Sequence, residues 1–157
     1  MEQHAFAQTT RSVLPNDVRF DFARNQRAKV AWTGIVRGIR VEKLRRPILS
    51  PRRNPRNDSR VYLTIEHRYF DWRETVGRGR RRYVLSSRGE GTFTAIVDME
   101  LGGANLPTNH FMNSMVVVYG TPVAMERSNP VVRSYHFRIT AKRRMFATGH
   151  YGRPTRY

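Results

Sequence analysis

Histidine, carboxylate and serine side chains are the residues of this chain that could carry catalysis or hold a metal. The histidines show no i, i+4 or HExxH spacing, so a metal site would need distant residues to converge; they are His4, His67, His110, His136 and His150. Carboxylates in the middle of the chain could form an acid–base pair, but nearby arginines favour ion pairing; these acids are Asp71, Glu74, Glu90, Asp98 and Glu100. Ser86 and Ser87 have no base close in the sequence. We therefore expect no catalytic residue, no metal site and no cofactor.

Arginine dominates the remaining chemistry. The chain has 157 residues, and its 29 Lys and Arg against 12 Asp and Glu give a net charge of +17. All but three of the cations are arginine, whose guanidinium makes bidentate contacts with phosphates and carboxylates. Self-repulsion destabilises so basic a chain unless anions are near, so we expect nucleic acid, anionic lipid or lipopolysaccharide, or an acidic protein surface as partner. Cysteine is absent, which excludes disulfides, thiolate metal ligands and a cysteine nucleophile.

The cations concentrate in three stretches: Leu44–Ser59, Arg73–Gly91, and everything after Glu126, where no acidic residue follows. Glycine, proline and like charge predict that these stretches are loops or extended arms. The run Gly-Arg-Gly-Arg-Arg-Arg at 77–82 is typical of an arm that orders on a partner, or of a solvated loop. The residues expected to bind a polyanion or a protein partner are Arg45, Arg46, Arg52, Arg53, Arg78, Arg80, Arg81, Arg82, Arg143 and Arg144.

Aromatic residues alternate with arginines in one part of the chain. Arg60, Arg68 and Arg73 stand beside four candidate stacking residues, Tyr62, Tyr69, Phe70 and Trp72. Barrels that bind single strands stack bases on such aromatics while arginines follow the backbone. The competing interpretation is that Phe70 and Trp72 cap a barrel and that the arginine stems lie over them.

Five stretches have the apolar pattern of strands, and they are the elements that must position these side chains. They are Lys29–Glu42, Arg60–Tyr69, Thr92–Leu101, Met115–Val123 and Val131–Lys142. Four of them alternate apolar and polar residues, and Met115–Val123 is a nearly continuous apolar run, as in a strand buried on both faces or paired centrally. Gly34 and Gly38 predict a bulge or sharp coiling where one strand serves both halves of a barrel. Val18–Phe22 predicts a short edge strand, and Ala104–Met112 is the only helical candidate.

Five strands with a small element between the third and the fourth follow the order of an OB-fold. The predicted fold class is all-β, a small five-stranded OB-like barrel with long Arg-rich loops and extended terminal arms. We expect residues 1–28 to form an N-terminal arm with a short edge strand, residues 29–144 the OB-like barrel domain, and residues 145–157 a basic C-terminal tail.

Four strand sequences resemble those of the Slp-type outer-membrane lipoproteins. The segments are Val30–Val36 (V-A-W-T-G-I-V), Gly91–Ala95 (G-T-F-T-A), Val116–Val123 (V-V-V-Y-G-T-P-V) and Pro130–Val132 (P-V-V). The chain departs from that family because it has no lipobox cysteine, its loops are longer and more basic, and it continues beyond the last strand. The resemblance implies a β-barrel of the bacterial envelope with a structural rather than a catalytic role.

Two functions compete at this point. The first is a non-catalytic structural or interaction subunit of a larger assembly, located in the periplasm or cell envelope, whose Arg-rich loops bind neighbouring protein subunits or anionic polymers. The second is a nucleic-acid-binding OB-fold protein, either a single-strand binder or a ribonucleoprotein component, in the cytoplasm or an organelle. Ala5-Phe6-Ala7 matches a signal-peptidase pattern, but residues 1–4 supply neither a charged nor an apolar region before it. No apolar run is long enough for a transmembrane segment.

Overall fold

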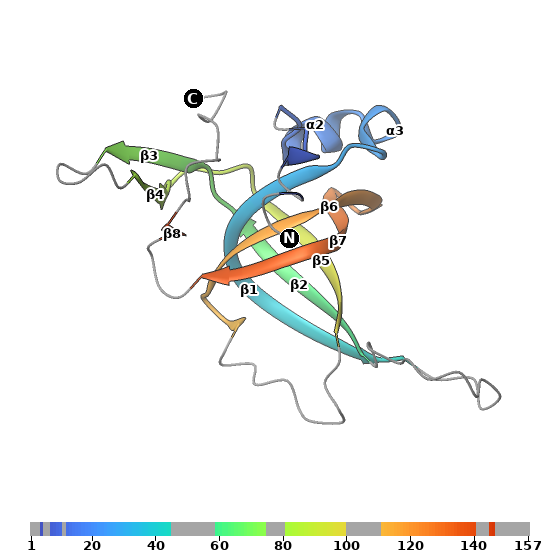
Figure 1. The fold of residues 1–157 in the computed structure, drawn as a ribbon. Coiled ribbons are helices and arrows are strands. Elements are labelled where there is room, and N and C mark those ends of the chain that lie inside the picture. The colour runs from blue at the N-terminus through green and yellow to red at the C-terminus, as the bar shows by residue number, and fades with distance from the viewer. Residues whose placement is uncertain are drawn as a thin grey trace.

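A computed structural model describes residues 4, 7–10, 12–44, 59–74, 81–99, 111–140 and 145–146. Within residues 12–146 of this description, two short helices precede eight strands (Figure 1). In chain order the elements are α2 (Pro15–Phe20), α3 (Phe22–Asn25), β1 (Val30–Lys43), β2 (Ser59–His67), β3 (Phe70–Glu74), β4 (Arg81–Leu85), β5 (Thr92–Met99), β6 (Met115–Glu126), β7 (Asn129–Thr140) and β8 (Met145–Phe146).

Five strands close into a barrel in the order β1-β2-β5-β7-β6, with β6 returning to β1. The pairing of β5 with β7 is parallel, and the other four pairings are antiparallel. Closure leaves no free edge where all five strands overlap, which a small all-β domain needs in order to avoid aggregation. The predicted class, a small all-β OB-like barrel, is confirmed.

The long first strand serves both halves of the barrel, as its glycines predict. Val30–Ile35 pairs with β6, Gly34–Lys43 pairs with β2, and the register shifts between Val36 and Gly38. At Gly34 the strand has neighbours on both sides, and an added Cβ would lie 2.2 Å from the carbonyl oxygen of Glu66. Only glycine permits this approach of two backbones, so Gly34 sets how tightly β1 coils.

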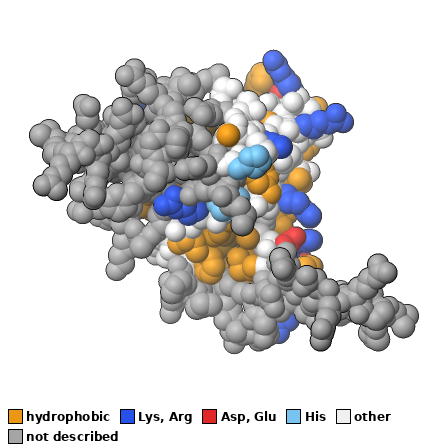
Figure 2. All heavy atoms as spheres, viewed as in Figure 1, with side chains coloured by type: hydrophobic (Ala, Val, Ile, Leu, Met, Phe, Trp, Pro, Cys, Tyr) orange, Lys and Arg blue, Asp and Glu red, His pale blue; other side chains and the backbone are white. Residues whose placement is uncertain are grey.

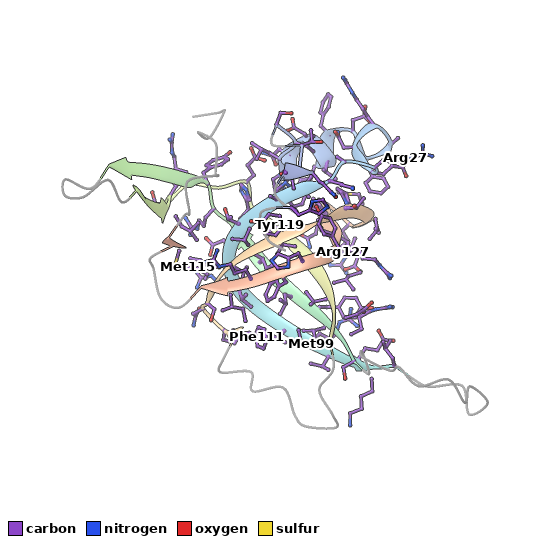
Figure 3. All side chains as sticks on the ribbon, viewed as in Figure 1. Arg27, Met99, Phe111, Met115, Tyr119 and Arg127 are labelled. Carbon is purple, nitrogen blue, oxygen red and sulfur yellow. The ribbon has the colours of Figure 1, made fainter. Side chains whose placement is uncertain are left out.

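The barrel core is built from the alternating apolar residues of these strands. Val61, Leu63 and Ile65 of β2 and Phe93 and Ala95 of β5 are fully buried, as their alternation predicts. Trp32 packs edge-on against Phe93, with ring centroids 5.1 Å apart. At the lower end of the barrel Phe111 stacks on Phe137 near Met99 (Figure 3). The predicted helix Ala104–Met112 lies outside the described residues except for Phe111 and Met112.

One wall of the barrel is buried on its outer side as well. Val116 and Val118 of β6 face the core, and the alternate residues Met115, Val117 and Tyr119 are at most 5% exposed. The expectation of burial on both faces is therefore confirmed for Met115–Gly120, whereas Val123 at the end of the predicted strand is 44% exposed. Other parts of the chain therefore cover the outer side of this part of β6 and shield it from solvent.

The predicted edge strand at Val18–Phe22 is wrong, because this stretch forms α2 and the start of α3. Pro15 occupies the first turn of α2, where its missing N–H costs nothing, and the Asp17 carboxylate accepts a hydrogen bond from the Leu14 N–H at 2.9 Å. Asp21 caps α3 by accepting from the Arg24 N–H. Only Val18 of the alternating apolar residues is buried in the barrel core, and Phe20 is 95% exposed. The N-terminal region is thus a pair of helices packed on the barrel rather than an extended arm.

Arg19 fixes these helices to the barrel. Its guanidinium donates to the carbonyl oxygens of Ser128 (2.9 Å), Glu90 (2.6 Å) and Thr92, and to the side chain of Asn16 (2.7 Å). Ser128 lies in the turn between β6 and β7, Glu90 precedes β5, Thr92 begins β5, and Asn16 lies in α2. One side chain therefore joins three separate parts of the fold, and the partial burial that this requires lowers its pKa.

We expect Arg19→Met to lower the free energy of unfolding by about 2 kcal/mol, because it removes charge-assisted hydrogen bonds and retains the apolar stem. Urea denaturation measures the change. Arg24→Met is the matched control, since Arg24 is an exposed arginine on α3, and its effect should stay within about 0.5 kcal/mol. Equal losses in the two variants would contradict the role given to Arg19.

The prediction that Arg73–Gly91 forms only a loop or arm is also wrong. β3 and β4 form an antiparallel hairpin in which Glu74 stands opposite Arg81, and β8 adds to β4 as a third strand. Arg73 faces Arg82, a like-charge pair that offsets the Glu74–Arg81 pair, so the β-favouring residues of β3 and β4 are what make a strand possible in so basic a segment. Because β8 spans Met145–Phe146, the predicted C-terminal tail begins with a paired strand.

The apolar residues that alternate along β7 do not all face the core. Phe137 packs on the core, but Tyr135 is 47% and Ile139 36% exposed. The register with β6 shifts between Tyr119 and Gly120, so His136 and Ser134 face these residues and Tyr135 is left over. A bulge of this kind reverses the inside–outside alternation, and the sequence alternation alone does not reveal it.

Candidate functional site

Two of the fourteen predicted site residues have described side chains, Tyr62 and Tyr69. Phe70 and Trp72 belong to β3, and Arg81 and Arg82 to β4, but their side chains lie outside the description. The remaining predicted arginines lie outside the described residues altogether: Arg45, Arg46, Arg52, Arg53, Arg78, Arg80, Arg143 and Arg144.

The two tyrosines do not form one stacking surface. Tyr62 lies on the outer face of β2, because its neighbours Val61 and Leu63 are buried in the core. Tyr69 follows β2, donates to the carboxylate of Glu90 at 2.7 Å and packs edge-on against His67. The contacts of Tyr69 are those of a structural residue, so of these two tyrosines Tyr62 is the candidate for ligand binding.

A buried cluster forms around His67 next to Tyr69. The His67 ring is 2% exposed, accepts a hydrogen bond on Nδ1 from the Glu90 N–H at 3.0 Å, and also lies near Phe93. Burial lowers its pKa to about 4, and the positive charges of Arg19 and Arg68 act in the same direction. His67 is therefore neutral at physiological pH, and its contacts join β2 to the segment that precedes β5.

Most arginines on the outer face of β1, β2 and β5 are neutralised by carboxylates. Arg60 donates to Asp98 at 2.8 Å, and Arg37 donates to Glu66 at 2.7 Å. Arg68 also contacts Glu66. The hydrogen bond from Arg37 is the main reason that the pKa of Glu66 lies below its usual value. These pairs confirm ion pairing as the use of Asp98, and they engage three arginines with two carboxylates, since Arg37 and Arg68 share Glu66.

A line of four residues crosses this face. The register places Arg40 of β1 beside Tyr62 of β2, Tyr62 beside Ile96 of β5, and Ile96 beside Arg133 of β7. We call these four residues the Arg40–Arg133 row. The guanidinium carbon of Arg40 lies 3.8 Å from the centroid of the Tyr62 ring, and both arginines are exposed. Two cations thus flank a half-buried aromatic and apolar centre.

Arg40 and Arg133 differ from their neighbours in their partners. Among the residues that the structure describes, neither forms an ion pair, whereas Arg37, Arg60 and Arg68 all do. Glu42 accepts a hydrogen bond from the Tyr62 hydroxyl at 2.9 Å and so orients the ring. The row therefore holds two cations of this face that no carboxylate pairs with among the described residues.

The sequence interpretation missed Arg40, Ile96 and Arg133. Each of these positions is outward in its strand, which alternation indicates for Arg40 and Ile96. Their alignment depends on the register of four strands that are distant in the sequence, and no local pattern carries that information.

The exposed surface outside this face is basic as well. In the view of Figure 2, Lys and Arg side chains line the edge formed by α2, α3 and the turn between β6 and β7, and Arg27 and Arg127 lie on that side in Figure 3. None of the described helices is both long enough and apolar enough to cross a bilayer. No protein-family model and no curated protein sequence matches this chain, so the likeness to the Slp-type lipoproteins rests on the strand sequences quoted above.

Proposed function

We propose that the protein is a non-catalytic interaction subunit, a Slp-like β-barrel that bridges neighbouring acidic surfaces or polyanions in a larger assembly. The observation that supports this proposal is the place where its two internal Arg-rich connections start. Residues 44–58 join β1 to β2 and residues 75–80 join β3 to β4. Both are hairpin connections, because Lys43 pairs with Ser59 and Glu74 pairs with Arg81.

The strand ends that the two connections join lie in different parts of the fold. β2 begins at Ser59, directly after the first connection, and its other end leads into β3. A strand of nine residues is about 26 Å long from its first to its last residue, so β2 spans that distance between the first connection and the segment that leads into β3. Figure 1 shows the far ends of β1 and β2 at the lower right and the hairpin of β3 and β4 at the upper left. Charges so placed suit two neighbours better than one groove.

The distribution of charge supports the same function. The described barrel face pairs most of its arginines with acids, and more than half of the net charge of +17 lies in segments outside the described residues. A charge that is not used inside the fold is available for a partner.

Agglutination of beads coated with polyglutamate tests the bridging. One variant carries Arg45, Arg46, Arg52 and Arg53 changed to Gln, and a second carries Arg78, Arg80, Arg81 and Arg82 changed to Gln. We expect the wild type to bind and agglutinate the beads at about 50 mM salt and to release them at about 500 mM, because screening weakens exposed charges. Each variant should still bind but no longer agglutinate, and the combined variant should do neither.

Thermal melting serves as the control. The substituted arginines lie in the connections or in β4, outside the five-stranded barrel, so the melting temperature should not change. Agglutination by either single variant at the wild-type level would contradict the bridging function. Loss of the folded state in the second variant would show that Arg81 and Arg82 are structural.

The bacterial envelope is the location that the resemblance favours. Fractionation of native cells should recover the protein with envelope components, together with the subunits that it contacts. Recovery with nucleoprotein particles instead would favour the second candidate function, nucleic-acid binding, whose supporting observation is the Arg40–Arg133 row.

A further inference from the structure

We propose that the Arg40–Arg133 row is a binding site for single-stranded nucleic acid, with a base against the Arg40–Tyr62 pair and phosphates at Arg40 and Arg133. The proposal deepens the second candidate function, nucleic-acid binding, because it names the surface and the parts of the ligand that each residue would contact. Its basis is the combination of two unpaired cations with an aromatic and apolar centre on one exposed sheet face.

The spacing of the row fits a strand that runs across the sheet. Adjacent strands lie about 4.8 Å apart, so the backbones at Arg40 and Arg133 are about 14 Å apart across three steps. Long arginine side chains at both ends reach phosphates on either side of the central residues. A ligand of this length needs negative charge at its ends and a planar apolar group between them, which describes a short stretch of single strand.

The centre of the row suits a base. Tyr62 and Ile96 stand side by side on β2 and β5, and both are half-buried. The Arg40 guanidinium on the Tyr62 ring forms a stack of the kind on which unpaired bases pack, because arginine and aromatic planes both attract π-systems. The Glu42 carboxylate holds the tyrosine hydroxyl and therefore keeps the ring in place before a ligand arrives.

The neighbouring ion pairs explain why the ligand is placed on this row and not elsewhere on the face. Arg60 and Arg37 are already bound by Asp98 and Glu66, and a phosphate would have to displace a carboxylate there. Arg40 and Arg133 meet no such competition among the described residues. The connection at residues 44–58, whose sequence contains five arginines, starts four residues after Arg40 in the chain.

The test uses the full chain and two probes of equal length, a 12-nucleotide thymidine strand and its abasic counterpart. We expect the thymidine strand to bind about tenfold more tightly, since stacking adds to the same phosphate contacts. Tyr62→Leu should remove this difference, and Tyr62→Phe should preserve it. Arg40→Gln and Arg133→Gln should weaken both probes and reduce the slope of log K against log salt by about 0.7 each.

Arg24→Gln is the matched control, because it removes an exposed arginine of α3 and should leave both affinities unchanged. Equal binding of the two probes by the wild type would overturn the proposal, as would wild-type affinity in Tyr62→Leu or in Arg133→Gln. Absence of binding at about 50 mM salt would overturn it too. If the wild type does not bind the thymidine strand but still agglutinates polyglutamate beads, the nucleic-acid site is excluded and the bridging function stands. If it binds the thymidine strand but does not agglutinate the beads, only the bridging function is excluded.

Discussion

Gly34→Ala is expected to lower the free energy of unfolding by about 3 kcal/mol or more, the largest effect of any substitution considered. The added methyl group would lie 2.2 Å from the Glu66 carbonyl oxygen and 2.6 Å from the Ile65 Cγ2. Gly34 pairs with β2 on one side and with β6 on the other, so neither β1 nor its neighbours can move away without breaking a ladder of the barrel. Urea denaturation followed by circular dichroism measures the loss.

Gly38→Ala in the same strand is the matched control. An added Cβ there meets the Thr64 side chain at 3.3 Å on the outer face, and the strand lies beyond the part that pairs with β6. We expect a change within about 1 kcal/mol. If both alanine variants lost the same stability, the cause would be the lost glycine flexibility rather than the close approach at Gly34.

Acid should destabilise the protein through His67 in the range between its two pKa values. The histidine titrates near 6.5 in the unfolded chain and at about 4 in the folded one, so the unfolded state takes up the proton first as the pH falls. Stability is therefore highest above pH 6.5, decreases towards pH 4, and loses about 2 kcal/mol between pH 7 and 5. Urea unfolding at several pH values measures the slope.

His67→Gln isolates this contribution. Glutamine does not titrate and retains an acceptor for the Glu90 N–H, so the decrease between pH 7 and 5 should shrink by most of those 2 kcal/mol. Glu66 adds a loss only at lower pH, because its pKa is held below the usual value by Arg37. An unchanged slope in His67→Gln would show that other groups cause the acid sensitivity.

The strands of the barrel could be predicted from the sequence because the alternation of apolar and polar residues that marks a strand is a local pattern. Alternation in Arg60–Tyr69 and Thr92–Leu101 identified the buried residues correctly, and Gly34 and Gly38 marked the coiled first strand. The segment Val18–Phe22 has the same alternation but forms helix, since Pro15, Asp17 and Asp21 supply helix starts and caps that outweigh a pattern of three apolar residues. Arg81 and Arg82 joined a strand because β3 offers β4 a partner.

The candidate site could be predicted only in part. Tyr62 was identified as a stacking residue from its place beside arginines, and in the structure the Arg40 guanidinium lies over its ring. Tyr69 satisfied the same local rule, yet it bonds to Glu90 in a structural cluster. The difference lies in which strand or segment faces each tyrosine, and that depends on contacts between residues more than twenty positions apart.

By itself the sequence determined the charge of this protein, the excess of arginine, the absence of cysteine and the number of barrel strands, since each follows from composition or from a period of two. Tertiary structure alone decided which arginines are neutralised and which remain available. Asp98 reaches Arg60 and Glu66 reaches Arg37 across strand pairs, while the register leaves Arg40 and Arg133 at the two ends of one row. Charge is additive along a chain, but ion pairing depends on distances of a few ångströms that only the closed barrel sets.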